Sequence, residues 1–275
     1  MSKRILNGAD VVDFIKERQA KQVRNLRQTW NIEPRLAIVQ TVDNPVIDTY
    51  VRLKQRYAED ILVECEHHKV AQEAVLATID ELNVRDDVHG IIVQLPLADP
   101  AQTDEALQRI DPAKDVDGLG VDPAFDPATP MAIGWLLASY GVELANRQIA
   151  IVGNGRLVGA PLAKMWRECG YNVTVFDQAS GDITQELNRY DIIVTATGVP
   201  GLIMSDMVKI GAVIVDAGTA SEQGVIRGDV APVVRERDDL TITPVKGGVG
   251  PLTVAALIDN VITAARRIAD GSLDD

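Results

Sequence analysis

Residues 151–165 read IVGNGRLVGAPLAKM, an apolar run followed by three glycines and then by a segment of helical character. In a strand, a tight turn and a helix that follow in this order, glycines let backbone N–H groups approach a pyrophosphate at the amino terminus of the helix. Gly153, Gly155 and Gly159 are therefore predicted to hold the phosphates of a dinucleotide. A glycine triplet is a weak signal by itself, so the alternative of a surface turn without a ligand stays open.

The next apolar run, YNVTVFD at 171–177, ends in a carboxylate. Asp177 stands about 20 residues beyond the glycines, where a Rossmann fold places the acid that accepts hydrogen bonds from the adenosine ribose. This spacing supports a dinucleotide site, and a strand-end Asp without a ligand is the alternative.

Strand-like and helix-like segments alternate in two blocks along the chain. Continuous apolar runs such as GIIVQLPL at 90–97 suit parallel strands that are covered on both faces. A stretch rich in Asp, Gly and Pro at 114–130 separates the two blocks, and we expect the domain boundary there or in the helix after it. We predict an α/β fold in which residues 1–130 plus 251–275 form one domain and residues 131–250 form a Rossmann-type dinucleotide-binding domain.

Composition excludes several classes of function. The chain has 275 residues, of which 46% are hydrophobic, and a formal net charge of −13. The acidic balance disfavours nucleic acid, because such a partner needs a basic surface that displaces phosphate counterions. Cys65 and Cys169 lack CxxC spacing and the amino terminus is polar, so we expect a cytoplasmic protein with reduced thiols. The apolar runs are too short for a membrane span, and His67, His68 and His89 form no ligand cluster, so neither a membrane nor a metal is expected.

The first block carries a second group of chemically active side chains. The segment DNP at 43–45 predicts the start of a helix, with Asn44 as N-cap and Pro45 at the first helical position. Tyr50 and Lys54 lie four residues apart on this helix, so they share one face.

Two polar residues follow in the same block. Gln94 lies near the carboxyl end of an apolar strand, where an amide costs free energy unless something bonds it, and Asp115 and Asp117 lie in the turn KDVDG. Each residue also has an ordinary structural interpretation: Tyr50 in the core, Lys54 solvated, Gln94 capping a loop and Asp117 favouring the turn before Gly118.

Taken together, these segments resemble the bifunctional methylenetetrahydrofolate dehydrogenase/methenyltetrahydrofolate cyclohydrolase family. The strings that carry the resemblance are, in chain order, YVRLK (50–54), GIIVQLPL (90–97), KDVDG (114–118), TP (129–130), VGAPLA (158–163), GDV (228–230) and TPVKGGVGPLT (243–253). The resemblance implies two α/β domains flanking a cleft, the second with a mostly parallel sheet, two long connecting helices and commonly a homodimer. It also implies oxidation of methylene-tetrahydrofolate to the methenyl form with a nicotinamide cofactor, and hydrolysis of that product to formyl-tetrahydrofolate.

The resemblance further implies residue roles. Lys54 would be the catalytic lysine and Gln94 its hydrogen-bond partner, while Tyr50 would stack on the folate and Asp117 would bind the pterin. The implied folate-binding residues are Tyr50, Asp117, Gly248, Gly250, Pro251 and Thr253. The implied cofactor-binding residues are Gly153, Asn154, Gly155, Arg156, Gly159, Asp177, Thr197 and Gly198.

Departures from the family pattern favour NAD over NADP. Asn154 stands where the family usually has an arginine, and Asp177 adds an anion where the family commonly has polar residues. Both changes oppose a 2′-phosphate, although Arg156 is close enough in sequence to reach one. Ile47, Ala128 and Lys246 also depart from the pattern and leave the details of the folate contacts open.

Two alternatives from other classes remain. A non-catalytic protein of the same fold that binds NAD and folate would accommodate the changes at Ile47 and Ala128, but the presence of Lys54 and its partners argues against it. A different two-domain dehydrogenase, similar to shikimate dehydrogenase, would have no need of the strings KDVDG and PVKGGVGP.

Overall fold

The computed structural model describes residues 3–218, 220–222 and 225–271 and divides into two compact units. The six-stranded unit consists of Met1–Val12 and Thr129–Thr253, and the three-stranded unit consists of Asp13–Ala128 and Val254–Asp275. Both boundaries with the terminal segments fall inside helices, α1 (Gly8–Thr29) and α9 (Val249–Ala269).

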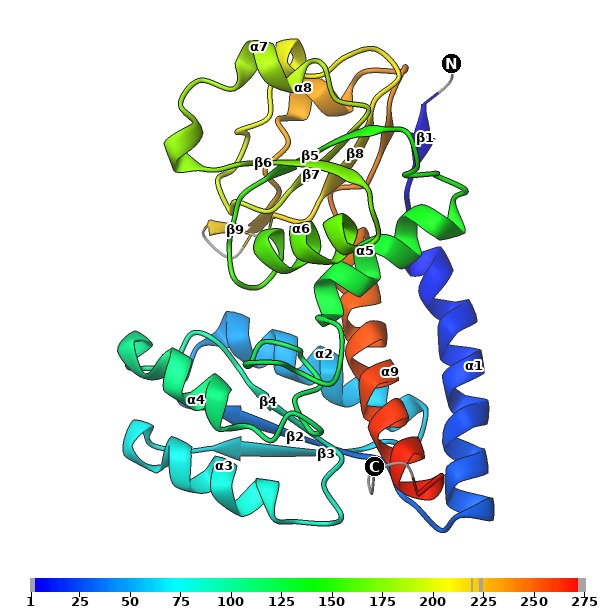
Figure 1. Cartoon of the computed structure of the whole chain (residues 1–275), viewed down its shortest axis with the longest axis vertical. Coiled ribbons are helices and arrows are strands. Elements are labelled where there is room, and N and C mark those ends of the chain that lie inside the picture. The colour runs from blue at the N-terminus through cyan, green and yellow to red at the C-terminus, as the bar shows by residue number, and fades with distance from the viewer. Residues whose placement is uncertain (1–2, 219, 223–224, 272–275) are drawn as a thin grey trace. The chain divides into compact units, whose positions relative to one another are not determined.

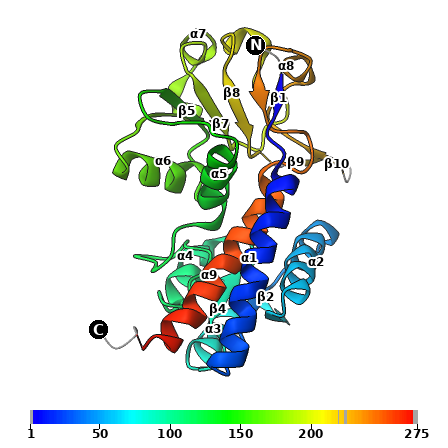
Figure 2. The same ribbon diagram turned by 90° about the vertical axis from the view of Figure 1, so that its right-hand side faces the viewer.

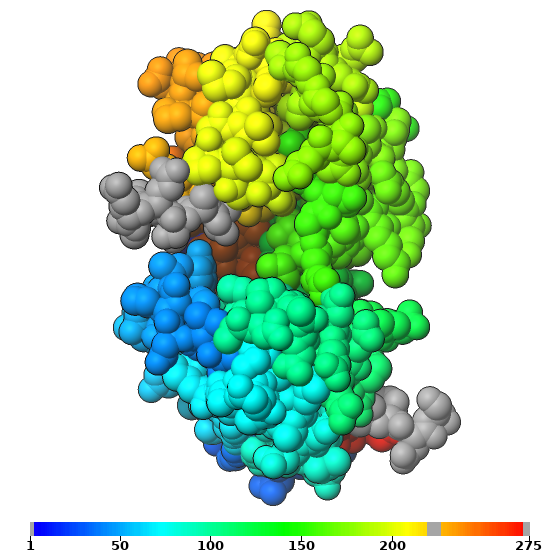
Figure 3. All heavy atoms as spheres, turned by 90° about the vertical axis from the view of Figure 1, so that its left-hand side faces the viewer, coloured from blue at the N-terminus to red at the C-terminus, as the bar shows by residue number. Residues whose placement is uncertain are grey.

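The three-stranded unit is built on a parallel sheet of order β3-β2-β4. Its strands are β2 (Arg35–Gln40), β3 (Glu64–Lys69) and β4 (Gly90–Val93), and its further helices are α2 (Pro45–Asp60), α3 (Val75–Asn83) and α4 (Thr103–Arg109), with 3₁₀ turns η1 (Gln72–Ala74) and η2 (Pro100–Gln102). Helices α3 and α4 pack with β2 and β4 in one apolar cluster. Figure 3 shows the face on which the α2 to α4 region, blue through teal, forms the surface of this unit.

Two long helices run together in this unit. The parts of α1 and α9 that belong to it lie side by side in both ribbon views (Figures 1 and 2). Gln19, fully buried, donates through Nε2 to the carbonyl of Ala255 at 2.8 Å and to Asp259 at 2.9 Å. The buried amide therefore has its hydrogen bonds satisfied across the helix pair, as burial of a polar group requires.

Helix α2 begins as the sequence predicts. The Asn44 side chain accepts a hydrogen bond from the N–H of Val46 at 2.8 Å, and Pro45 occupies the first turn. Ile47 and Val51 are buried and hold the helix against the unit. The burial of this face fixes the orientation of α2 in the unit, and with it the positions of Tyr50 and Lys54.

The six-stranded unit has a parallel sheet of order β1-β11-β8-β7-β5-β6, so the predicted α/β class with a mostly parallel second sheet is confirmed. Its strands are β1 (Arg4–Ile5), β5 (Gln148–Val152), β6 (Asn172–Phe176), β7 (Ile192–Thr195), β8 (Val213–Asp216) and β11 (Thr241–Ile242). Its other elements are α5 (Ala128–Ser139), α6 (Gly159–Glu168), α7 (Thr184–Leu187), α8 (Pro232–Arg235), the turns η3 (Gln178–Ser180) and η4 (Ser205–Met207), and the hairpin of β9 (Ala220–Glu222) and β10 (Val225–Arg227).

The amino terminus lies outside the domain that the sequence assigned to it. Strand β1 pairs in parallel with β11, with Arg4 opposite Thr241, so residues 1–12 belong with the six-stranded unit. The strand is two residues long, and local pattern cannot indicate where so short a segment pairs.

Strand order in this unit reverses at β5. The chain passes from β5 to β6 on one side and then to β7 on the other. In open α/β sheets such a switch point leaves a crevice at the carboxyl ends of the strands, where ligands bind.

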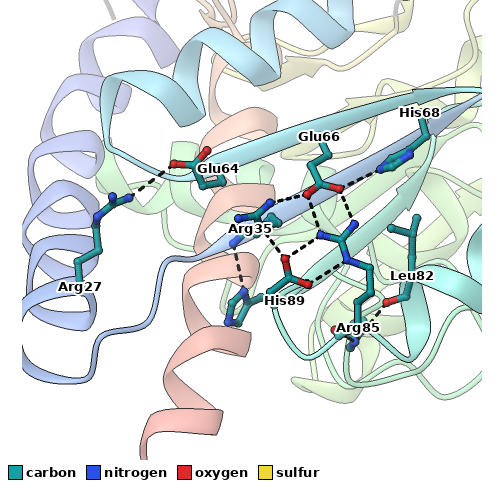
Figure 4. A network of polar contacts seen from close by, with 10 residues as sticks. Arg27, Arg35, Glu64, Glu66, His68, Leu82, Arg85 and His89 are labelled. Atoms are coloured by element: carbon teal, nitrogen blue, oxygen red, sulfur yellow. Dashed lines mark hydrogen bonds and ion pairs between the residues drawn. The ribbon is translucent and has the colours of Figure 1, made fainter.

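A network of charged side chains ties β3 to its neighbours in the three-stranded unit (Figure 4). Glu66 accepts hydrogen bonds from Arg85 at 2.8 and 2.9 Å and also from Arg35. The bonds from Arg85 lower the pKa of Glu66 to about 2. The network thus joins β3, β2 and the segment after α3.

His89 at the edge of this network is buried and neutral. Its Nδ1 faces the backbone N–H of Arg35 at 3.2 Å, and burial lowers its pKa to about 4 from the ordinary 6.5. The unfolded chain therefore binds more protons as the pH falls from 6.5 to 4, so stability is lost in that window, by about 3 kcal/mol for this group.

We expect His89→Asn, which keeps an acceptor for the N–H, to flatten this loss in denaturant titrations at pH 7 and 4.5. Equal losses in the variant and the parent would contradict the assignment.

Candidate functional site

The structure brings Lys54 and Gln94 together. Lys54 Nζ donates to Gln94 Oε1 at 2.7 Å. Gln94 directly follows β4, and its backbone N–H donates to the carbonyl of Val39 at 2.8 Å, which fixes the residue at the carboxyl end of the sheet. The amide predicted to need a partner thus has one, and the partner is the lysine on α2.

Asp117 and Lys54 act on each other electrostatically. Burial lowers the pKa of Lys54, and the negative charge of Asp117 works against this shift. Burial likewise raises the pKa of Asp117, and the positive charge of Lys54 works against that. The two pKa values therefore move toward each other, which makes proton exchange at Lys54 easier near neutral pH than for a solvated lysine.

Cys65 is a neighbour of Lys54 that sequence reasoning missed. Burial raises the pKa of its thiol to about 11, with the charge of Lys54 acting in the opposite direction. A thiol of this pKa is neutral at physiological pH, so Cys65 adds no charge beside the lysine. Cys65 lies on β3, and a place on a strand does not by itself indicate contact with a helix.

Tyr50 lies one helical turn before Lys54 and is half-buried. It shares the face of α2 that carries the lysine, as its spacing predicts. Of the positions that depart from the family pattern, Ile47 and Ala128 are buried, whereas Lys246 is exposed. The first two are therefore part of the packing of the core.

The turn KDVDG divides its work among its residues. Asp115, 2% exposed, accepts hydrogen bonds from the N–H groups of Gly118 at 3.1 Å and Gly120 at 2.7 Å. Lys114 donates to the carbonyls of Asn83 and Arg85, both at 2.7 Å, at the end of α3.

These contacts assign different tasks to the two aspartates. Burial raises the pKa of Asp115 to about 6, although the backbone amides of Gly120, Gly118 and Leu119 stabilise its charge. Asp115 is thus a structural residue that shapes the turn, while Asp117 interacts with Lys54. The sequence alone showed two acids in one turn and could not reveal which of them is bonded to the backbone.

The glycine-rich turn after β5 requires two of its glycines for steric reasons. A Cβ at Gly153, where φ is +107°, would lie 2.5 Å from the carbonyl oxygen of Ala196. A Cβ at Gly159 would lie 1.9 Å from the carbonyl oxygen of Gly153. Gly155 has open space where its Cβ would be, so only close approach of a ligand would require glycine there.

A pocket of about 850 Å³ opens beside this turn at the carboxyl ends of β5, β6 and β7. Its volume suits a nucleotide-sized ligand. Among the predicted cofactor residues that line it are Gly153, Asn154, Gly155, Asp177 and Thr197. Gly198 follows Thr197 in the chain, and Arg156 and Gly159 continue the turn into α6.

Asp177 is held at this pocket by its own backbone turn. Its side chain accepts hydrogen bonds from the N–H of Ala179 at 2.9 Å and from the Ser180 hydroxyl, and it caps η3. The carboxylate is exposed, so a negative charge lies at the pocket where a ribose or its phosphate would bind.

The predicted folate residues near the carboxyl terminus form the start of α9. Gly248 directly precedes the helix, and Gly250 and Pro251 lie in its first turn. The carbonyl of Gly247 accepts a hydrogen bond from the N–H of Ala9 at 3.1 Å. A Cβ at Gly8 would lie 1.9 Å from the carbonyl oxygen of Gly248. Close packing against this loop therefore requires glycine at position 8. Thr253 donates to the carbonyl of Val249 at 3.4 Å within the helix.

Within the described parts of the chain, no group of three or more His, Cys, Asp and Glu side chains is arranged to hold a metal ion. No helix in the same residues has the length and apolar character needed to cross a membrane.

Comparisons with known proteins agree with this geometry. The family model for the tetrahydrofolate dehydrogenase/cyclohydrolase catalytic domain matches residues 6–117, and the model for the NAD(P)-binding domain of the same family matches residues 127–269. The bifunctional protein FolD of Nitrosomonas europaea is 36% identical to this chain, in an alignment that covers 97% of the chain and 95% of the relative.

Solved structures show the same likeness. The bifunctional methylenetetrahydrofolate dehydrogenase/cyclohydrolase of Campylobacter jejuni has a TM-score of 0.91 and 34% identity, with 97% of this chain and 100% of that chain covered. The Trypanosoma brucei enzyme, complexed with NADP and an inhibitor, has a TM-score of 0.90 and 31% identity, with 98% and 99% covered. A shikimate dehydrogenase of Thermus thermophilus reaches a TM-score of 0.54 at 18% identity, which is a likeness of fold alone.

Proposed function

Because the chain belongs to the tetrahydrofolate dehydrogenase/cyclohydrolase family, we propose that Lys54 is the base of its hydrolytic reaction and that NAD is its preferred cofactor. The chain is a bifunctional enzyme of one-carbon folate metabolism, which oxidises methylene-tetrahydrofolate to methenyl-tetrahydrofolate and hydrolyses the latter to formyl-tetrahydrofolate. The bound nicotinamide cofactor supplies the hydride acceptor for the first reaction.

The two reactions place different demands on the protein. In the oxidation, the methenyl cation that forms is stabilised by its own two nitrogens, so the protein mainly has to align the reacting groups. In the hydrolysis, a water molecule must lose a proton as it attacks, and this step needs a base whose pKa lies near the working pH.

The hydrogen bond from Lys54 to Gln94, beside Asp117, carries the proposal for the hydrolysis. Burial lowers the pKa of Lys54, so a larger fraction of the amine is neutral and able to accept the proton. Gln94 holds Nζ in one position. We propose that Asp117 binds the adjacent N–H donors of the pterin, since a carboxylate matches such a pair with charge-assisted hydrogen bonds. We propose that Tyr50 stacks on the face of the folate ring.

An assay that separates this proposal from the alternatives starts with the purified protein and methylene-tetrahydrofolate, with NAD or NADP. Reduced nicotinamide should accumulate, and the methenyl absorbance should rise and then decay as the formyl product forms. A protein that binds both ligands without turnover would support the non-catalytic alternative. Turnover of shikimate in place of the folate would support the other dehydrogenase.

The preference for NAD rests on the charges at the pocket. Asp177 lines it, as does Asn154, which has no charge with which to hold a 2′-phosphate. The steric need for glycine at 153 and 159 is the same whether the ligand is NAD or NADP. The two cofactors differ only in the 2′-phosphate, so the residues near that phosphate decide between them.

We expect kcat/KM to be at least about tenfold higher with NAD than with NADP, because a phosphate dianion beside a carboxylate is unfavourable. The double variant Asn154→Arg with Asp177→Ser should shift the preference toward NADP. Equal or higher efficiency of the parent enzyme with NADP would refute the preference and would leave Arg156 as the first residue to test.

A homodimer and a cytoplasmic location are part of the same proposal. Sedimentation of the purified protein at several concentrations tests the dimer. Cys65 and Cys169 are both free thiols, which agrees with a reducing compartment.

A further inference from the structure

Two buried aspartates join the strand ends on which the cofactor pocket is built. Asp216 ends β8, and Asp229 follows β10 in the string GDV. Asp229 is fully buried, and the side chain of Asp216 is 2% exposed. A carboxylate in such surroundings is costly unless donors surround it, so the partners of each one show what it holds in place.

Asp229 holds the segment that leaves β7. Its Oδ2 accepts from the backbone N–H of Thr197 at 2.7 Å and from the hydroxyl of Thr195, which is also fully buried. Its Oδ1 is buried, has no hydrogen-bond partner in the described structure, and lies against Gly218, where a Cβ would come within 2.0 Å of it. One side chain therefore sets the positions of the segments after β7 and after β8.

Asp216 fixes Asp229 in turn. Its Oδ1 accepts from the N–H groups of Gly218 and Asp229, at 3.1 and 3.0 Å, and its Oδ2 accepts from Val230 at 3.1 Å and from Arg235. Burial raises the pKa of Asp216, and the nearby charge of Asp229 acts in the same direction.

Arg235 extends this network to β11. It donates to the carbonyl of Thr243 at 2.7 Å, and the hydroxyl of Thr243 accepts from the backbone N–H of Asp216 at 2.9 Å. The carboxyl ends of β7, β8 and β11 are thereby joined by side chains on residues far apart in the sequence.

The network reaches the cofactor pocket through Thr197. Ala196 and Thr197 line the pocket, and the glycine turn rests on them, since a Cβ at Gly153 would lie 2.5 Å from the Ala196 carbonyl oxygen and 3.2 Å from Thr197 Cγ2. Any shift of the Thr197 backbone therefore moves the surface on which the dinucleotide turn packs.

We propose that Asp229 is a positioning residue for the dehydrogenase reaction, one that holds the segments after β7 and β8 so that the cofactor is presented in a single geometry. The inference rests on the proposed dinucleotide site. Hydride transfer depends on alignment within a fraction of an ångström, whereas the proposed base of the hydrolysis, Lys54, and its partners Gln94 and Asp117 lie in the three-stranded unit. Loss of Asp229 should therefore affect the two activities of the enzyme unequally.

The test compares both activities in the full-length Asp229→Ala protein. We expect kcat of the dehydrogenase to fall by about ten- to a hundredfold, more than KM for the cofactor rises, because a misplaced reactant costs rate at saturation. Methenyl hydrolysis without added cofactor should stay within about twofold of the parent. The dehydrogenase kcat of Asp229→Asn should lie between that of the parent and that of Asp229→Ala. The amide oxygen of Asn can still accept from the N–H of Thr197, and the Oδ1 position has no hydrogen bond to lose.

Asp191→Ala is the matched control. Asp191 precedes the opposite end of β7, where it accepts from the N–H of Gln148 at 2.8 Å and from Lys209 at 2.5 Å. It should leave both activities near those of the parent.

The outcomes separate the two proposals. A parent protein that is inactive with both NAD and NADP would overturn the proposed function. With an active parent, dehydrogenase rates within twofold in Asp229→Ala would overturn the positioning role, as would equal loss of both activities or the same selective loss in Asp191→Ala. If Asp229→Ala does not fold, Asp229→Asn decides, with a selective fall in kcat of threefold or more as the supporting result.

Discussion

Lys54→Gln is expected to remove methenyl-tetrahydrofolate hydrolysis by a factor of about a hundred or more, the usual range for loss of a general base. Glutamine keeps the length and polarity of the side chain but cannot accept the proton of the attacking water. Hydride transfer takes no proton from the carbon, so dehydrogenase activity should remain measurable. Methenyl-tetrahydrofolate should then accumulate while the cofactor is reduced.

The measurement is methenyl hydrolysis in a buffer that hydrolyses the substrate slowly by itself. Lys69→Gln is the matched control, because Lys69 makes ion pairs with Asp43 and Asp48 in the same unit and should leave both activities intact. Gln94→Ala should show the hydrolytic defect in milder form, since Gln94 positions Lys54 through a hydrogen bond of 2.7 Å but does not itself accept the proton. A near-normal rate in Lys54→Gln would place the base elsewhere, and the proposed mechanism would have to be abandoned.

Asp117→Ala is expected to weaken folate binding and lower both activities by about ten- to a hundredfold. The missing carboxylate would leave the pterin donors without partners in a partly desolvated site, at about 1–3 kcal/mol. KM for the folate and the two rates report this loss directly.

The same variant should also shift the pH profile of the hydrolysis. Asp117 raises the pKa of Lys54 against the effect of burial, so its removal lets that pKa fall further. The hydrolytic rate rises with pH as the amine loses its proton, and the rising limb should move to lower pH in Asp117→Ala. An unchanged limb would show that Asp117 does not act on the base.

Asp115→Ala provides the contrast within the same turn. Its loss would leave the N–H of Gly120 unpaired, and the N–H of Gly118 would keep only the backbone carbonyl of residue 115 at 3.2 Å, so the midpoint of thermal unfolding should fall, with a smaller change in KM for the folate. If Asp115→Ala and Asp117→Ala behave alike in KM and in stability, the assignment within KDVDG is wrong.

The sequence by itself determined the features that depend on local geometry. Continuous apolar runs predicted parallel strands, and Asn44 with Pro45 predicted the start of α2, because capping and periodicity act over a few residues. The spacing of Gly153 and Gly159 after an apolar run predicted the dinucleotide turn, although the contact that excludes a side chain at Gly153 comes from Ala196 beyond β7. Resemblance to a family added the residue roles, which local pattern could not supply.

Tertiary structure decided which of these side chains meet and in which state of charge. Lys54, Gln94 and Asp117 come from a helix, a strand end and a turn, and their shifted pKa values arise from burial, which no spacing in the sequence reveals. Strand β1 joins the six-stranded sheet through only two residue pairs, and its partner β11 lies near the other end of the chain. No local pattern in the sequence could therefore predict this pairing. The hydrogen bonds of Asp229 likewise connect segments that only the folded sheet brings together, so the string GDV gave no sign of its task.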